Sequence, residues 1–173
     1  MEPAMILSIL EHTPVWVWAV FCAVSALGLA QTRTRNVGRA RAILLPVVMV
    51  GLSLSGTFNT FTQVPLALAA WTAGFALALS FAGAAMAVRG ASWSPATRRF
   101  QVPGSWLPVA LILGIFVTKY VAGACLATNP SLSTNTSLTW LLSLLYGTFA
   151  GLFWARARSL VNLTRSGRTV QPA

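Results

Sequence analysis

The chain has 173 residues, of which 56% are hydrophobic and only 8% are charged. Soluble domains usually carry about 25% charged residues, so this composition excludes an ordinary water-soluble protein. The formal net charge of +10 would indicate nucleic-acid binding only if the basic residues shared one water-exposed face.

Five apolar segments predict an all-α, polytopic membrane protein. They cover about 14–30, 42–61, 66–88, 106–127 and 138–155. A helix of roughly 20 apolar residues crosses the hydrocarbon core of a bilayer, and each backbone amide in it must bond within the helix. We expect five transmembrane helices that form a single bundle over residues 14–157.

The segment 1–13 precedes the first predicted span. It contains both acidic residues of the chain, Glu2 and Glu11, and its one histidine, His12. Its apolar residues favour a short helix at the outer membrane surface. Because it begins with an acid instead of the basic stretch of a signal peptide, we expect it to be retained.

Arginine-bearing segments alternate with uncharged connectors along the chain. The basic residues outside the spans are Arg33, Arg35, Arg39, Arg41, Arg89, Arg98, Arg99, Arg156, Arg158, Arg165 and Arg168. They follow the first, third and fifth spans, whereas the connectors 59–65 and 128–137 carry no charge. The positive-inside rule therefore predicts an N-terminus outside and a C-terminus in the cytoplasm.

The same pattern predicts the partners of the basic segments. Arginines on the cytoplasmic side would meet the anionic headgroups of membrane lipids, and no nucleic acid is expected. Residues 158–173 form a basic cytoplasmic tail, whose small and polar composition favours partial disorder beyond Leu163.

Small residues recur at every fourth position in three of the predicted spans. These stripes include Gly74 in the third span, Gly114 in the fourth, and Gly147 and Gly151 in the fifth. Such positions let helix backbones approach closely within a membrane. They could pack the helices of one chain, or they could join the chain to further copies or to another membrane protein. We therefore expect a homo-oligomer or a membrane partner.

Lys119 is the one charged residue inside a predicted span. An ammonium group near the centre of a bilayer costs about 2.5 to 3.5 kcal/mol on insertion scales. One hypothesis is an outward-facing pocket for a ligand or an ion, formed by Lys119, Tyr120, Glu11, His12 and Asn59. The alternative is that the flexible Lys119 side chain only reaches toward the outer surface and has no further role.

The sequence lacks the groups that enzymes and metal sites require. It has one histidine, no aspartate and no Cys-x-x-Cys spacing, so we expect neither a metal site nor a haem. Nucleophile-elbow and phosphate-loop motifs are also missing. We expect no cofactor and no catalytic residue. The two function hypotheses are a transport or permeation component, and a structural or accessory subunit that docks a larger partner through its small-residue faces.

Two short motifs carry a resemblance to known proteins. Residues 11–18 read EHTPVWVW, and residues 51–56, in a proline-led second span after an arginine-rich loop, read GLSLSG. In these features the chain resembles a group of small bacterial inner-membrane proteins of unknown function. The resemblance covers roughly the first third of the chain. It implies a multi-pass protein of the bacterial cytoplasmic membrane and assigns no activity.

Overall fold

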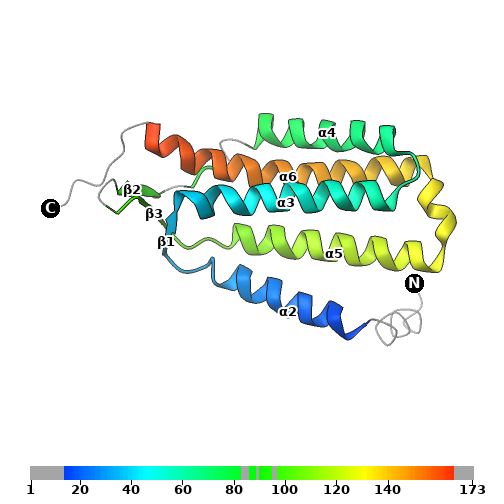
Figure 1. Ribbon diagram of the computed structural model, residues 1–173, viewed down its shortest axis with the longest axis horizontal. Helices are drawn as coiled ribbons and strands as arrows, with labels where there is room; N and C mark the ends of the chain where they lie inside the picture. Colours follow the sequence, from blue (N-terminus) through cyan, green and yellow to red (C-terminus); the bar gives the residue numbers. More distant parts are fainter. Residues whose placement is uncertain (1–13, 83–85, 89, 95–96, 166–173) are drawn as a thin grey trace. The chain divides into compact units, whose positions relative to one another are not determined.

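The structure is a computed structural model, and it describes residues 14–82, 86–88, 90–94 and 97–165 (Figure 1). In chain order the elements are α2 (Val15–Leu29), β1 (Arg35–Gly38), α3 (Arg39–Thr60), α4 (Val64–Phe81), β2 (Ser92–Ser94), β3 (Arg99–Val102), α5 (Leu107–Thr128), the 3-10 helix η1 (Pro130–Thr134) and α6 (Thr136–Arg165). Two compact units divide the chain. Unit 1 combines residues 1–32 with 105–130, and unit 2 combines residues 33–104 with 131–173.

Four of the described helices, α3, α4, α5 and α6, are long and apolar enough to cross a membrane. This confirms that the chain is mostly helical and has the helices of a membrane protein. Helix α2 is also apolar, but with 15 residues it is shorter than the other four. The fifth span, the direction of threading and the single bundle remain predictions.

Unit 1 contains α2 and α5, which pack against each other in opposite directions. Gly28 near the end of α2 lies against Val109 near the start of α5, where an added Cβ would be 3.5 Å from the Val109 Cα. Further along the pair, the rings of Phe21 and Phe116 are 5.1 Å apart. The Ser105 amide donates a hydrogen bond to the Gln31 carbonyl, which joins the two segments where they leave the helices.

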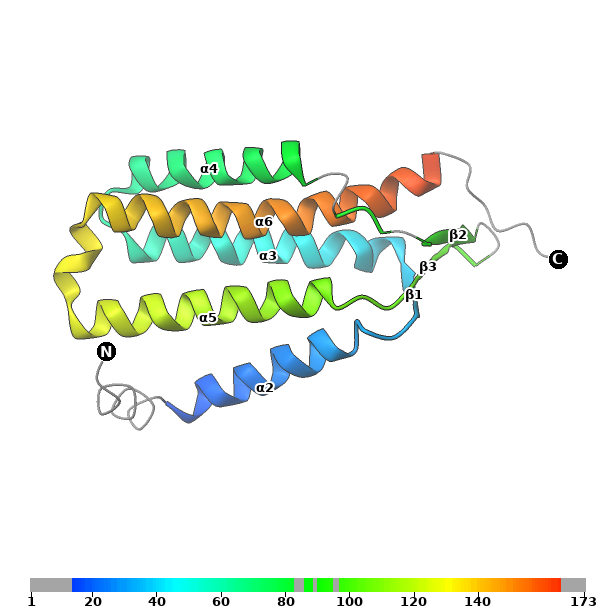
Figure 2. The same ribbon diagram turned by 180° about the vertical axis from the view of Figure 1, so that it is seen from behind.

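Unit 2 is organised around α6, which packs against both α4 and α3 (Figures 1 and 2). The contact between α4 and α6 is close enough to bring backbone against backbone. A Cβ on Gly74 would collide with the Leu144 carbonyl, and one on Gly147 would collide with the Trp71 carbonyl. The small residues on these two helices therefore serve packing within the chain.

A three-stranded antiparallel sheet of order β1-β3-β2 also belongs to unit 2, and the sequence analysis did not anticipate it. Phe100 at its centre is fully buried and lies opposite Val37 on one side and Trp93 on the other. The Trp93 and Phe100 rings are 4.6 Å apart. Segments that were expected to be plain loops thus form a small hydrophobic cluster of their own.

This cluster explains why α6 is longer than expected. The fifth span was predicted to end near residue 155, followed by a tail from residue 158, whereas α6 continues to Arg165. Leu160 is buried among Val37, Phe100 and neighbouring side chains, and Leu163 packs against the same cluster. Burial of these leucines stabilises the extra turns, so α6 includes residues 158–165, which were expected to begin the basic tail.

Helix α4 is shorter than expected, because it ends at Phe81 although the third span was predicted to reach Val88. Ala82 caps the helix through its amide, which donates to the Ala78 carbonyl. The next residue in the sequence is Gly83, the residue type favoured just after a helix end. The chain then pairs as β2 instead of continuing as a helix.

The two ends of unit 2 differ in charge. Strand β1 leads directly into α3, β3 pairs with β1, and α6 contacts β2. This basic end gathers Arg35, Arg39, Arg41, Arg99, Arg156 and Arg158. At the opposite, uncharged end, the Thr62 hydroxyl donates to the Ser133 carbonyl and the Gln63 amide donates to the Thr134 carbonyl. Arginine-bearing segments thus meet one another, and so do the uncharged connectors.

Candidate functional site

Lys119 lies on α5 in unit 1, and its side chain is exposed. One turn earlier, Phe116 contacts Phe21 of α2 and stacks on Tyr120, with the latter two rings 6.2 Å apart and inclined by 11°. Tyr120 is half-buried in this arrangement. Lys119 therefore belongs to an apolar helix, which also contributes Phe116 and Tyr120 to an aromatic cluster with Phe21 of α2.

The other residues of the expected pocket are placed differently. Asn59 is exposed near the end of α3 in unit 2, whereas Lys119 and Tyr120 belong to unit 1. Glu11 and His12 lie outside the described residues. The convergence of these five residues on one pocket therefore stays a prediction.

The glycines that were expected at helix contacts have distinct surroundings. Gly74 and Gly147 lie in the close α4–α6 contact, and a Cβ on Gly151 would come within 2.7 Å of both the Ala78 side chain and the Phe75 carbonyl. Gly114 on α5 is half-buried, and its carbonyl accepts a hydrogen bond from the Thr118 hydroxyl. The small residues of α4 and α6 thus already pack against each other within one chain.

A polar junction joins the three helices of unit 2. The Trp71 indole on α4 donates to the Ser53 hydroxyl on α3 over 2.9 Å, and Ser53 in turn donates to the Tyr146 carbonyl on α6 over 3.0 Å. Hydrogen bonds of this kind connect helices across apolar surroundings. Sequence reasoning missed this junction, since a serine among the small residues of a span gives no sign of its partners.

The basic end of unit 2 brings like charges together. Burial, and secondly the charge of Arg41, lowers the pKa of Arg35. Arg156 on α6 lies close enough to Arg35 for their charges to interact as well. The acids of the chain are Glu2 and Glu11, so no Asp or Glu within residues 14–165 neutralises this end.

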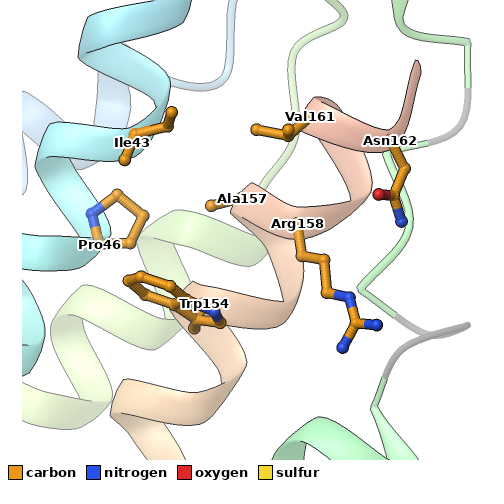
Figure 3. A pocket seen from close by; sticks show the side chains of 7 residues that line it. All are labelled: Ile43, Pro46, Trp154, Ala157, Arg158, Val161 and Asn162. Atoms are coloured by element: carbon orange, nitrogen blue, oxygen red, sulfur yellow. The ribbon is translucent and has the colours of Figure 1, made fainter. Parts of the chain in front are cut away.

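A groove of about 270 Å³ opens between the start of α3 and the last turns of α6 (Figure 3). Its lining consists of Ile43 and Pro46 from α3 and of Trp154, Ala157, Arg158, Val161 and Asn162 from α6. Most of the surface is apolar, with one guanidinium and one amide at the α6 side. The sequence did not reveal this groove, because its walls come from segments more than a hundred residues apart.

Within the described part of the chain, no three His, Cys, Asp or Glu side chains come together as metal ligands would. Cys22 on α2 and Cys125 on α5 are both free thiols. The hydroxyls of Ser25 and Ser143 are buried, and neither finds a hydrogen-bond partner among the described residues. Among the described residues, the most prominent polar features are Lys119 on α5, the Ser53 junction and the arginines of the basic end.

The comparisons with known proteins agree with the expectation of a family without assigned activity. No curated protein and no solved structure matches the chain. A family of unknown function, DUF6622, matches residues 1–171. Because this match spans nearly the whole sequence, the chain, whose described residues include four helices long and apolar enough to cross a membrane, belongs to this family of unknown function.

Proposed function

We propose that the protein is a non-enzymatic permeation component of the bacterial inner membrane, in which Lys119 binds an anionic or polar solute on its way across. The observation that supports this most directly is an exposed lysine, Lys119, within the apolar helix α5. At 1.5 Å per residue, Lys119 lies roughly 18 Å from the start of α5 and roughly 14 Å from its end. A charge at that depth usually marks a substrate or ion pathway.

The same face of α5 supports assembly from several copies. Gly123 follows Lys119 by one helical turn, is exposed, and would accept a Cβ without meeting any atom within 4 Å. The two helices that the structure describes in unit 1 are too few to enclose a water-filled path. We therefore propose a homo-oligomer in which this face of α5 lines the path, while the arginines of the basic end meet anionic lipid headgroups.

Anion efflux from liposomes tests this function. The purified protein in phosphatidylcholine vesicles should release entrapped chloride, and Lys119→Met should slow the release by at least about tenfold, since a charge-assisted contact contributes about 1.5 to 3 kcal/mol. Lys119→Arg keeps the charge and should retain most of the flux. Lys119→Met protein that inserts normally and conducts like the wild type would refute the role of Lys119.

A second candidate function is that of a structural or accessory subunit. From the sequence, we expected this subunit to dock through its small-residue faces. Three of those residues, Gly74, Gly147 and Gly151, are however already covered by neighbouring helices of the same chain. Gly51 on α3 and Gly123 on α5 instead have open space around them, so a larger membrane partner would dock there. Mass spectrometry of complexes purified in native lipid tests this candidate: Gly51→Leu or Gly123→Leu should lower recovery of a defined partner, whereas a wild-type chain recovered alone would contradict it.

A further inference from the structure

The groove between α3 and α6 joins an apolar floor to a cationic rim. Figure 3 shows Ile43 and Pro46 of α3 across from Ala157 and Val161 of α6, with Trp154 at one end of the groove. Ile43 is 38% exposed and Trp154 is 36% exposed, so the groove is open at these two residues, whereas Pro46 and Ala157 form its buried floor. Arg158 is exposed as well.

Along α6, the polar side chains that line the groove change from an aromatic ring to a cation toward the basic end. Trp154, Arg158 and Asn162 are four residues apart, so they follow one another along a single face of the helix. At 1.5 Å per residue, the guanidinium-bearing turn lies about 6 Å beyond the indole in the direction of the basic end. An aromatic ring of the type found at membrane interfaces is thus followed by a cation, and the apolar Ala157 and Val161 lie beside them.

Charge complementarity identifies the occupant. The basic end of unit 2 carries a net positive charge, because Arg39, Arg41, Arg99 and Arg158 belong to its segments and the sequence of residues 14–165 contains no Asp or Glu. Guanidinium groups bind phosphate oxygens in a fixed, two-pronged geometry. A free phosphate would use the rim alone, whereas a lipid also covers the apolar floor.

We propose that this groove binds one anionic phospholipid, with its phosphate on Arg158 and an acyl chain along Ile43, Pro46 and Ala157. Asn162, one turn beyond Arg158, contacts the polar headgroup. The lipid thereby joins the start of α3 to the end of α6 at the side of the membrane where the arginines gather. This site is independent of Lys119, which belongs to the other unit.

Native mass spectrometry of the full chain tests the site. The protein is reconstituted in nanodiscs of equal parts phosphatidylglycerol and phosphatidylcholine, and the lipids that remain bound after transfer to detergent are counted. One phosphatidylglycerol should be retained in preference to phosphatidylcholine. Arg158→Gln should lower its affinity by about tenfold, the loss expected when a charge-assisted contact to phosphate is removed.

Two variants separate the groove from general surface charge. Arg33→Gln removes an equally exposed arginine that does not line the groove, and it should retain the lipid. Ile43→Trp fills the floor without changing the charge, and it should release the lipid as Arg158→Gln does. Unfolding in detergent by circular dichroism verifies that each variant is folded.

Each alternative result overturns the proposal. Equal retention of phosphatidylcholine would mean that the rim does not select a charge. If Arg33→Gln and Arg158→Gln lost the same amount of bound phosphatidylglycerol, the arginines would attract headgroups diffusely and would not form a site. Retention by a folded Ile43→Trp variant would show that no acyl chain occupies the groove.

Discussion

At the scale of single residues, two serines on different helices illustrate opposite uses of a hydroxyl in apolar surroundings. Ser53 accepts from the Trp71 indole and donates to the Tyr146 carbonyl, so it joins α3, α4 and α6. Ser143 on α6 is fully buried and has no hydrogen-bond partner among the described residues. A paired polar group stabilises helix association, whereas an unpaired one carries the penalty of lost solvation.

Ser53→Ala should therefore destabilise the protein by between about 0.6 kcal/mol, the average for a hydrogen bond between membrane helices, and about 1.7 kcal/mol, the largest such value. The substitution removes both bonds and leaves the Trp71 N–H without its acceptor. Ser55→Ala is the matched control, because the Ser55 hydroxyl bonds only to the Leu52 carbonyl of its own helix. Reversible unfolding in mixed detergent measures both variants, and equal stability losses would contradict the junction.

Ser143→Ala should act in the opposite direction. Removing a buried hydroxyl without a partner leaves the helix contacts in place and relieves its desolvation, so we expect a gain of up to about 1 kcal/mol in the free energy of unfolding. The same unfolding measurement applies. A loss as large as that of Ser53→Ala would mean that the Ser143 hydroxyl has a partner, such as a buried water molecule.

At the scale of elements, the contact between α4 and α6 determines how unit 2 packs. Gly74 and Gly147 allow backbone contact, and Gly151 receives the Ala78 side chain. Around this contact the Trp71 and Phe75 rings stack 5.1 Å apart. Close approach maximises van der Waals contact, the main attraction between helices when lipid removes the hydrophobic driving force.

Gly147→Ala should separate these helices. Its new methyl group would overlap the Trp71 carbonyl, a backbone group that can move only with its helix. We therefore expect the free energy of unfolding to fall by roughly 1 to 3 kcal/mol. Gly51→Ala is the control, since an added Cβ there meets no atom within 4 Å. There the change should be neutral, or stabilising by up to about 1 kcal/mol because alanine favours helix. Similar losses in the two variants would contradict the packing.

The long helices could be predicted from sequence because an apolar run of membrane length is a local property. The sheet could not, since β1 pairs with β3 across more than sixty residues and each strand has only three or four residues. The alternation of Arg99, Phe100, Gln101 and Val102 was the available signal. The last turns of α6 pack against that same sheet, which is why the helix continues beyond the predicted end of the fifth span.

The features of the candidate site also differ in whether the sequence alone can reveal them. Lys119 stands out in the sequence because a charge interrupts an apolar run. The groove between α3 and α6 depends on how positions 43–46 meet positions 154–162, and the Ser53 junction depends on partners from two other helices. Features that require tertiary contacts cannot be recognised from the spacing of residues along one helix.

At the scale of the whole molecule, charge is distributed unevenly in unit 2: one end carries arginines and the other end is uncharged. The basic end combines the sheet with the arginine-bearing ends of α3 and α6, and the uncharged end is closed by hydrogen bonds from Thr62 and Gln63. A bilayer between these two ends would be about 30 Å thick, and α3 with 22 residues is long enough to cross it. The positive-inside rule then predicts that the basic end faces the cytoplasm.

Labelling of single cysteines in a chain with Cys22→Ala and Cys125→Ala tests this orientation. Asn36→Cys and Gln101→Cys place exposed thiols on paired strands of the basic end, and Thr62→Cys places one at the uncharged end. A membrane-impermeant maleimide should modify Thr62→Cys in intact spheroplasts, and it should reach the other two only after lysis, because the bilayer separates them. Asn36→Cys and Gln101→Cys must behave alike, since they are partners in one sheet. Labelling of Asn36→Cys and Thr62→Cys from the same compartment would refute both the threading and a transmembrane α3.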